Sequence, residues 1–227
     1  MDNSLNQSTY EKFKKDILTF GLKPGDTVSA AKIADRYSVS RTPAREALVR
    51  LEAEGLVDII PQSKSVISRI DADKARQEWF IRRSLELSMV DTLFERITQS
   101  DIKKMQAYNS YMLELSKKQR THENTYNYLM ADNEFHAVTY RICGQVLSEA
   151  VIKNTMAHYL RLRFLTELDE VYQGRTVHGH EELIELLNNS DSAGYKKALS
   201  VHLGHAMNDI SEMERIFPDY FVKTSQD

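Results

Sequence analysis

Apolar side chains recur with a helical period through most of the chain, and the first such segment is short. Tyr10, Phe13 and Ile17 fall at positions i, i+3 and i+7, which predicts an amphipathic helix over residues 9–20. Gly21 and the Pro-Gly turn over residues 22–26 end this helix. The chain therefore opens on a short helix followed by a tight turn.

Two further short helices follow with little chain between them. Ser29 is a favourable N-cap for a helix that ends at Tyr37. Thr42 as N-cap and Pro43 at the first helical position predict a third helix, which ends before Gly55. Its inner face carries the small or apolar residues Ala44, Ala47, Leu48 and Leu51. Small residues permit the close helix crossing that is typical of a helix-turn-helix.

After the third helix the pattern changes from a helical to an extended one. Residues 56–60 and 65–70 are rich in β-branched side chains, and residues 61–64 join them. Two short strands and a turn behind a helix-turn-helix predict a wing. Residues 1–70 are therefore expected to form a winged helix-turn-helix domain of three helices plus a two-stranded wing.

From residue 71 onward the helical period is nearly continuous. Trp79, Leu85, Met89 and Leu93 predict one long helix, and residues 105–115 lie on the next. Further helices are expected over about 123–143, 146–170, 177–189 and 192–216. Residues 71–227 should form an all-α bundle of about six to seven helices, so the predicted fold class is mainly α.

Composition narrows the choice of partners and compartment. The net charge is −3; residues 1–70 hold 11 Lys and Arg against 9 Asp and Glu (+2), and the remainder holds 19 against 24 (−5). Nucleic acid would therefore have to bind a local basic patch. Cys143 is the single cysteine, no signal-peptide pattern opens the chain, and no apolar run approaches the roughly 18 residues of a membrane span. We expect a cytoplasmic protein without a membrane partner.

The outer face of the third predicted helix is basic and offers such a patch. Arg41 and Arg45 lie near its start, where the helix dipole also favours phosphate, and Arg50 follows near its end. An arginine fork can bind guanine O6 and N7 or clamp a phosphate. Exposed arginines usually lie on a merely solvated helix face, but the neighbouring helix-turn-helix and wing favour DNA contact here.

The segment "VSRTPAREALVRLEAEGLV" resembles the recognition segment of GntR-family winged-helix repressors, and "LKPGDTV" is similar to the exit from that family's first helix. The resemblance implies that Arg41 and Arg45 read operator bases. The full set of residues expected to contact double-stranded DNA is Ser40, Arg41, Thr42, Arg45, Arg50 and Lys64. Many relatives carry a basic residue and a glycine at the wing tip, where this chain has Ser63 and Lys64, so we expect Lys64 to contact a phosphate.

Candidate metal ligands lie in the second half of the chain. Asp132 and His136 in "ADNEFHAV" are four residues apart and share one helix face. His180 and His202 lie on two predicted helices joined by the turn at residues 190–191, and an antiparallel hairpin would bring them level. Such pairs and single histidines are more often structural, so spacing alone leaves the metal open.

Three stretches, "FIRRSLELSMVDTL", "ADNEFHAVTYRICG" and "GHEELIELLNNSDSAGYKKALSVHL", resemble the ligand-sensing FCD domain of one GntR subfamily. The resemblance implies a divalent metal, with Zn²⁺ favoured and Ni²⁺ or Mn²⁺ as alternatives, held by Asp132, His136, His180 and His202. Open coordination positions would accept a carboxylate effector. Arg82 matches the arginine that faces the family's cavity, although an ion pair with Glu86 at i+4 is the alternative. Further effector candidates are Arg83, Arg161, Arg163 and His205.

The function that these patterns predict is a homodimeric, ligand-responsive transcriptional regulator, by family habit a repressor, on a near-palindromic operator. Its effector would be a small organic acid. One alternative keeps the DNA-binding role with a structural or absent metal and a bulkier effector such as acyl-CoA. A remote alternative is a metal-dependent hydrolase, for which Glu181 beside His180 is the nearest general base. Because adjacent helix positions point about 100° apart, we expect no enzyme.

Overall fold

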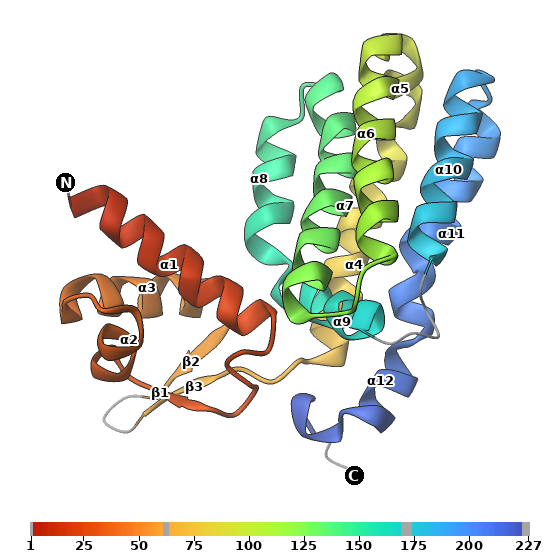
Figure 1. Cartoon of the computed structure of the whole chain (residues 1–227). Coiled ribbons are helices and arrows are strands. Elements are labelled where there is room, and N and C mark those ends of the chain that lie inside the picture. Colours follow the sequence, from red (N-terminus) through yellow and green to blue (C-terminus); the bar gives the residue numbers. More distant parts are fainter. Residues whose placement is uncertain (1, 61–63, 169–173, 224–227) are drawn as a thin grey trace.

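Three helices and a small sheet form the N-terminal part, which we call the head (Figure 1). The computed structural model describes residues 2–60, 64–168 and 174–223. The head comprises α1 (Asp2–Leu18), β1 (Thr27–Val28), α2 (Ala30–Tyr37), α3 (Arg41–Ala53), β2 (Val57–Ile59) and β3 (Ser65–Ile67). Its core joins α1 to α2 and α3 through Phe13, Ile17, Ile33 and Leu51, each at most 1% exposed. The expected winged helix-turn-helix is confirmed.

The local signals in the head place both ends of α2 correctly, but α1 begins at Asp2 rather than at residue 9, and the cap of α3 is shifted. Ser29 caps α2 by accepting a hydrogen bond from the Lys32 amide, as predicted. The cap of α3 is Ser40 rather than Thr42, and Pro43 is the third helical residue. Proline is tolerated there because the first four N–H groups of a helix have no intrahelical acceptor.

The wing is part of a three-stranded sheet with the order β1-β3-β2, in which both pairs are antiparallel. Strand β1 was not predicted, since two residues are too few to show a pattern. The predicted tip residue Ser63 lies outside the described residues. Lys64 is exposed at the start of the returning strand.

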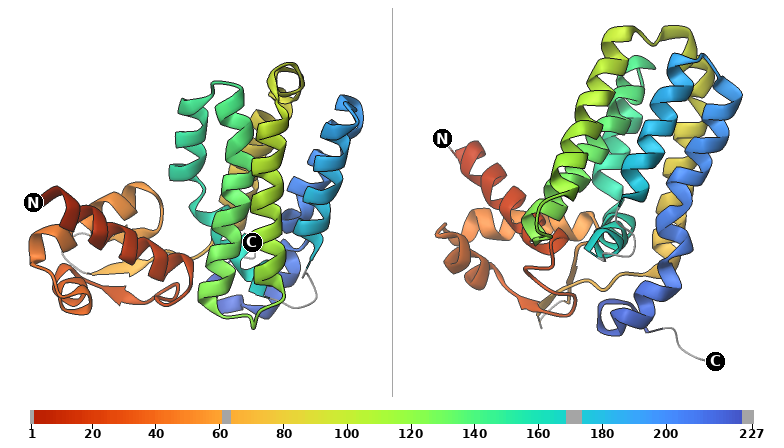
Figure 2. Two further views of the ribbon diagram at one scale, coloured as in Figure 1. Left: turned by 45° about the horizontal axis from the view of Figure 1, so that its top comes forward. Right: turned by 45° about the vertical axis from the view of Figure 1, so that its right-hand side comes forward.

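Behind the head, nine α-helices of the described residues form the bundle, which stands beside the head (Figures 1 and 2). They are α4 (Ala72–Ser88), α5 (Val90–Arg96), α6 (Gln99–Ser116), α7 (His122–Ile142), α8 (Val146–Thr155), α9 (Ala157–Leu168), α10 (Arg175–Asn188), α11 (Ser192–Asn208) and α12 (Ile210–Ile216), followed by a 3-10 turn at Pro218–Tyr220. The mainly α fold class is confirmed, with more and shorter helices than expected.

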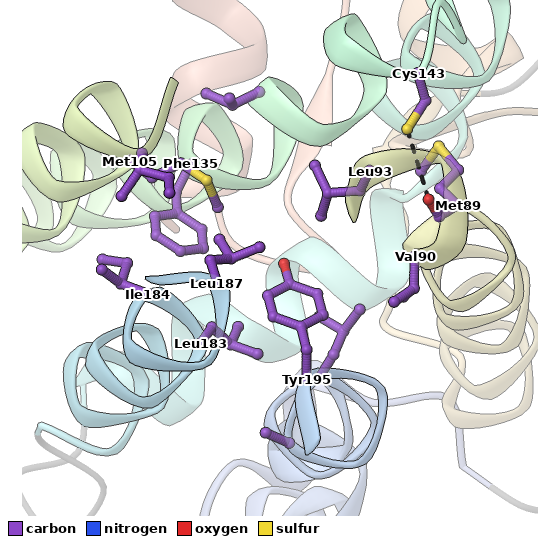
Figure 3. Packing of buried hydrophobic residues seen from close by; sticks show 14 of the residues in the cluster. Met89, Val90, Leu93, Met105, Phe135, Cys143, Leu183, Ile184, Leu187 and Tyr195 are labelled. Carbon is purple, nitrogen blue, oxygen red and sulfur yellow. Dashed lines mark hydrogen bonds between the residues drawn. The ribbon is translucent and has the colours of Figure 1, made fainter. Parts of the chain in front are cut away.

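Three predicted helices are each divided in two. The breaks lie at Met89, Met156 and Asp209. Both halves of each pair face a common core, so the apolar period runs across the break and hides it. Figure 3 shows Met89 in that core, where the Cys143 thiol lies 3.7 Å from the Met89 carbonyl oxygen and donates to it. This contact gives a partner to a carbonyl at the end of α4.

The head and the bundle are joined by more than the connecting chain. Ile70, between β3 and α4, pairs with Phe221 near the other end of the chain, with backbone hydrogen bonds of 2.8 Å from the Ile70 amide to Tyr220 and from the Val222 amide to Ile70. Lys15 of α1 also forms an ion pair with Glu123 of α7 at 2.7 Å. These contacts fix where the head sits on the bundle.

Candidate functional site

Part of the predicted DNA-binding set forms one exposed surface on the head. Arg41, Thr42 and Arg45 are exposed at the start of α3, Ser40 is exposed beside them, and Ala44 and Ala47 are buried on the opposite face. Among the described residues, no ion pair engages Arg41 or Arg45. The start of α3 is therefore free to meet phosphates and base edges.

Arg50 lies on a different side of α3. Five residues beyond Arg45, it is turned by about 140° around the helix, and its guanidinium carbon lies 3.7 Å from the ring centroid of Tyr10 on α1. Its Nη1 donates to Gln7 at 3.0 Å. A DNA contact by Arg50 stays a prediction. In the structure the Arg50 side chain lines the space between the head and the bundle.

The four predicted metal ligands converge inside the bundle. Asp132 and His136 lie on α7, His180 on α10 and His202 on α11, and one donor atom from each lies within 4.8 Å of the others. The Nε2 atoms of His136 and His202 are 3.1 Å apart, and those of His136 and His180 are 3.4 Å apart. The antiparallel pairing of α10 and α11 does bring the two distant histidines level, as the turn predicted.

Neighbouring groups fix the orientation of two of these rings. His136 donates from Nδ1 to Glu86 on α4 at 2.6 Å. His180 donates from Nδ1 to the side-chain oxygen of Asn109 on α6 at 3.2 Å, and the Asn109 amide donates to the Val177 carbonyl. With Nδ1 protonated, both neutral rings present an Nε2 lone pair to the centre.

The chemistry of the centre fits a divalent cation. The Nε2 lone pairs of His136 and His180 meet the Asp132 Oδ1 atom at 4.0 and 3.5 Å. That oxygen is buried and has no hydrogen-bond partner among the described residues. Three converging acceptors repel one another unless a cation lies between them, and three imidazoles plus one carboxylate are a common donor set for Zn²⁺ or Ni²⁺.

Protonation states also favour a metal. Burial lowers the pKa of His180 to about 3 and that of His202 well below its ordinary value. Burial alone would raise the pKa of Asp132, but the charge of Arg163 and the neighbouring histidines outweigh burial and hold it below its usual range. Near neutral pH His180 and His202 are therefore neutral imidazoles and Asp132 is a carboxylate, which are the forms that bind metal.

The five predicted effector residues do not lie together. Arg82 donates to Glu86 at 2.8 Å and lies 3.8 Å from Asp132, while Arg163 donates to Asp132 at 2.5 Å. His205 is the next histidine along α11 from His202, with a buried Nδ1 that lacks a partner among the described residues. The i, i+4 pair of Arg82 and Glu86 exists, but it is buried rather than on the surface as the alternative supposed.

The remaining two arginines serve other contacts. Arg83 donates to Ser200 of α11 at 2.7 Å. Arg161 is fully buried at the junction of head and bundle, where it donates to the Ser68 carbonyl at 2.6 Å. His158, to which sequence reasoning gave no role, accepts from the Asp71 amide at 3.0 Å in the same junction. We place Arg161 and His158 in the connection between the two parts and not at the cluster.

Three functional neighbours were missed from the sequence. Asn109 orients His180, Glu86 orients His136, and Tyr140 lies one helical turn beyond His136 on the wall of a cavity beside the cluster. The spacing of Tyr140 from His136 was the one available signal, because residues four apart share a helix face. Asn109 gives no local signal, since only the packing of α6 on α10 brings it to His180.

Comparison with known proteins decides the family. The chain matches the FCD domain over residues 79–205, more than half of its length, and the family described as bacterial regulatory proteins, gntR family, over residues 5–67. The chain is a GntR-family regulator with an FCD domain. The regulator is a DNA-binding transcription factor and not an enzyme. Glu181, the candidate general base, is exposed and pairs with His178 at 3.0 Å, away from the cluster.

Proteins of similar sequence are also transcriptional regulators. The regulator is 25% identical over 219 residues to the HTH-type transcriptional repressor RspR of Escherichia coli K12, covering 96% of this chain and 93% of that protein. It is 24% identical over 197 residues to the gluconate operon transcriptional repressor of Bacillus subtilis 168, covering 85% and 79%. The solved structure of E. coli McbR/YncC has a TM-score of 0.74 at 18% identity, over 94% of this chain and 98% of that one, which supports the fold.

None of the described helices combines the length and the apolar character needed to cross a membrane.

Proposed function

We propose that the regulator is a homodimeric, cytoplasmic repressor whose operator affinity is set by a small organic acid bound at a divalent metal. The observation that carries the proposal is the buried convergence of Asp132, His136, His180 and His202, with three acceptors facing one point. Zinc is the favoured metal, with nickel and manganese as alternatives. The metal would supply a Lewis-acidic position for a carboxylate oxygen.

Electrostatics support an acid as effector. A divalent cation with the Asp132 carboxylate has a net charge of +1, and the buried Arg82 and Arg163 lie beside it. Glu86 offsets one of these charges through its bond to Arg82. The site as a whole stays positive, and an anionic ligand would be favoured in such a buried place.

The DNA half of the proposal rests on the exposed start of α3. In this proposal Arg41 and Arg45 read bases, and Ser40, Thr42 and Lys64 contact phosphates. We expect Arg45→Ala to weaken specific operator binding by about 1–3 kcal/mol without loss of folding. Arg96→Ala, which lies in the bundle, is the control. Fluorescence anisotropy with operator DNA measures both, and an unchanged affinity for the operator in Arg45→Ala would contradict base reading.

A dimer is supported by an unpartnered apolar face. Helix α8 has no buried residue, exposes Leu147 by 79% and Val146 by 69%, and packs beside α4, which exposes Ile81 by 43%. Apolar side chains gathered on two neighbouring helices mark an interface in a folded protein. A second copy of the chain would cover this face and set two recognition helices on one palindromic operator.

Metal analysis tests the sensing half. Elemental analysis of protein purified without chelators should find about one divalent ion per chain, and His136→Ala or His202→Ala should lose it. The control is His178→Ala, because His178 is exposed and only two residues from His180. If both ligand variants keep their full metal content, the ligand assignment is wrong.

For the acid to act as an effector, it must bind the DNA-competent and DNA-incompetent arrangements differently. A tenfold change in operator affinity corresponds to about 1.4 kcal/mol of coupling. Operator titrations with and without the acid measure that coupling in the wild type, and the metal-free variants should lack it.

A further inference from the structure

A cavity of about 390 Å³ runs between the head and the bundle, and we call it the interdomain cleft. Its inner end reaches the metal-ligand cluster and is lined by Arg82, Glu86, His136, Tyr140 and Arg163. Its outer end is lined by residues of α1 and by Arg50 of α3. One continuous space therefore touches both the sensing cluster and the helix that carries the DNA-reading arginines.

The inner end presents unused hydrogen-bonding groups. Tyr140 is 2% exposed, and its hydroxyl has no partner among the described residues. Burial raises the pKa of Tyr140 above its ordinary value, so the group remains a hydroxyl and can donate. Among the described residues Arg82 makes its hydrogen bond through Nε, and its Nη2 atom lies 3.8 Å from Asp132. A buried, unpartnered hydroxyl facing a cavity is a strong indication of a missing polar partner.

The middle of the cleft is apolar. On the bundle side it is lined by Tyr126 and Met130 of α7, Ile152 of α8, and Met156 and Leu160 around the start of α9. On the head side Tyr10 and Leu18 of α1 face them. Most ligand sites combine such apolar walls with a few convergent polar groups. The middle of this cleft therefore favours a hydrocarbon body over a second charged group.

Both lysines at the outer end already have carboxylate partners. Lys14 pairs with Glu54 at 2.7 Å, and Lys153 pairs with Glu149 at 2.8 Å. Arg50 stacks on Tyr10, whose hydroxyl donates to Glu54 at 2.5 Å. The two lysines thus place no demand for another anion on an occupant, and the wall of the outer end is built by α1 and the last turn of α3.

From these features we propose that the interdomain cleft binds an organic acid with an aliphatic or aromatic body. Its carboxylate lies at the inner end between the Tyr140 hydroxyl and Arg82, and its body lies between Met130 and Tyr10. The inference rests on the proposed function, which supplies the acid-binding centre, and adds the chemical class of the acid and its contact with the head. Ligand binding then acts on the head directly, because the ligand forms part of its contact with the bundle.

The test compares two acids that share a carboxylate and differ in their bodies. Zinc-loaded full-length protein is titrated by calorimetry with 4-phenylbutyrate and with acetate. We expect 4-phenylbutyrate to bind about tenfold tighter or more, since burying its apolar body in the cleft removes hydrocarbon surface from water. Equal affinities would overturn the cleft proposal and leave the proposed function standing, whereas no binding of either acid would overturn both.

A pair of matched variants locates the body of the acid. Met130→Glu places a charge in the middle of the cleft, and Met207→Glu makes the same change at a half-buried methionine of the bundle that does not line it. We expect Met130→Glu to lose the preference for 4-phenylbutyrate over acetate and Met207→Glu to keep it, with zinc content unchanged in both. Loss of the preference in both variants, or in neither, contradicts the proposed location.

Hydrogen exchange of the wild-type protein gives a readout that needs no variant. If the body of the acid contacts the head, 4-phenylbutyrate should slow amide exchange in residues 7–18 of α1, and acetate should not. Protection confined to α7 and α9 would show a ligand held by the bundle alone and would overturn the proposed contact with the head.

Discussion

Glu86 connects an arginine and a metal ligand within the core of the bundle. It is 2% exposed, accepts from Arg82 at 2.8 Å and from His136 at 2.6 Å, and is the residue that fixes the His136 tautomer. Partners of this kind tune a metal without touching it. The effect of Glu86 on metal binding can therefore be measured as a change in metal affinity while all four ligands are still present.

We expect Glu86→Gln to lower zinc affinity by about 10–100-fold while keeping the protein folded, because the amide oxygen still accepts but carries no charge. Competition with a chromophoric chelator measures the affinity. Glu182→Gln, at an exposed position of α10, is the control and should match the wild type. A wild-type affinity in Glu86→Gln would show that Glu86 serves only its bond to Arg82.

Residue-scale features were predictable where they have a local cause. Asp132 and His136 share a helix face by spacing alone, and the family resemblance implied their partners His180 and His202. Asn109 could not be predicted because its role depends on which helices pack together, and the spacing of Tyr140 from His136 gives its helix face but not the cavity that it lines. Neither the packing of the helices nor the position of a cavity can be read directly from the sequence.

At the scale of elements, a titratable side chain of α4 accepts a hydrogen bond from the first turn of α9. Glu78 accepts from the Tyr159 amide in the first turn of α9 at 2.7 Å, and burial, the largest cause, raises its pKa to about 7. A carboxyl with a raised pKa holds its proton in the folded state at pH values where the unfolded chain has lost it. The free energy of unfolding should then fall as the pH rises from about 4.5 to 7.

We expect Glu78→Gln to remove this dependence and to raise the free energy of unfolding at pH 8 by about 1–3 kcal/mol, a range reduced for partial solvent exposure. Urea unfolding at pH 5 and pH 8 measures it, with the exposed Glu185→Gln as the control. An identical pH profile in the wild type and Glu78→Gln would show that Glu78 titrates normally.

The same scale explains why helix boundaries were only partly predictable. Residues 79–93 and 192–216 keep one apolar period across the breaks at Met89 and Asp209, because both halves cover the same core. Ser29, in contrast, makes its cap within three residues, so its sequence signal and its structure agree. A helix end can be predicted from the sequence where a nearby side chain caps it. A helix break that depends on tertiary packing cannot.

For the whole molecule, the apolar face of α4 and α8 predicts the state of assembly. We expect Leu147→Glu to give a monomer, because a charge at this exposed position cannot be buried against a second copy without a partner. Light scattering after size exclusion measures the mass. Val201→Glu is the control, since Val201 is 59% exposed on α11 and lies outside that face. A dimer in Leu147→Glu would move the interface elsewhere.

The monomer should also bind the operator more weakly, because it presents a single recognition helix to a two-fold site. Anisotropy with full-length and half-site operators separates this effect from damage to the head. Leu147→Glu should keep its half-site affinity, and a loss there would point to a defect in the head itself.

The backbone pairing of Ile70 with Phe221 has a consequence for the order of events during synthesis. Every helix of the bundle lies between these two residues in the chain, so this backbone bridge forms only after the bundle has been translated. Domains commonly fold in order as they emerge. The head can therefore form its own core early and contact the bundle through Lys15 and Arg161, but the bridge from Ile70 is added only when the segment around Phe221 arrives.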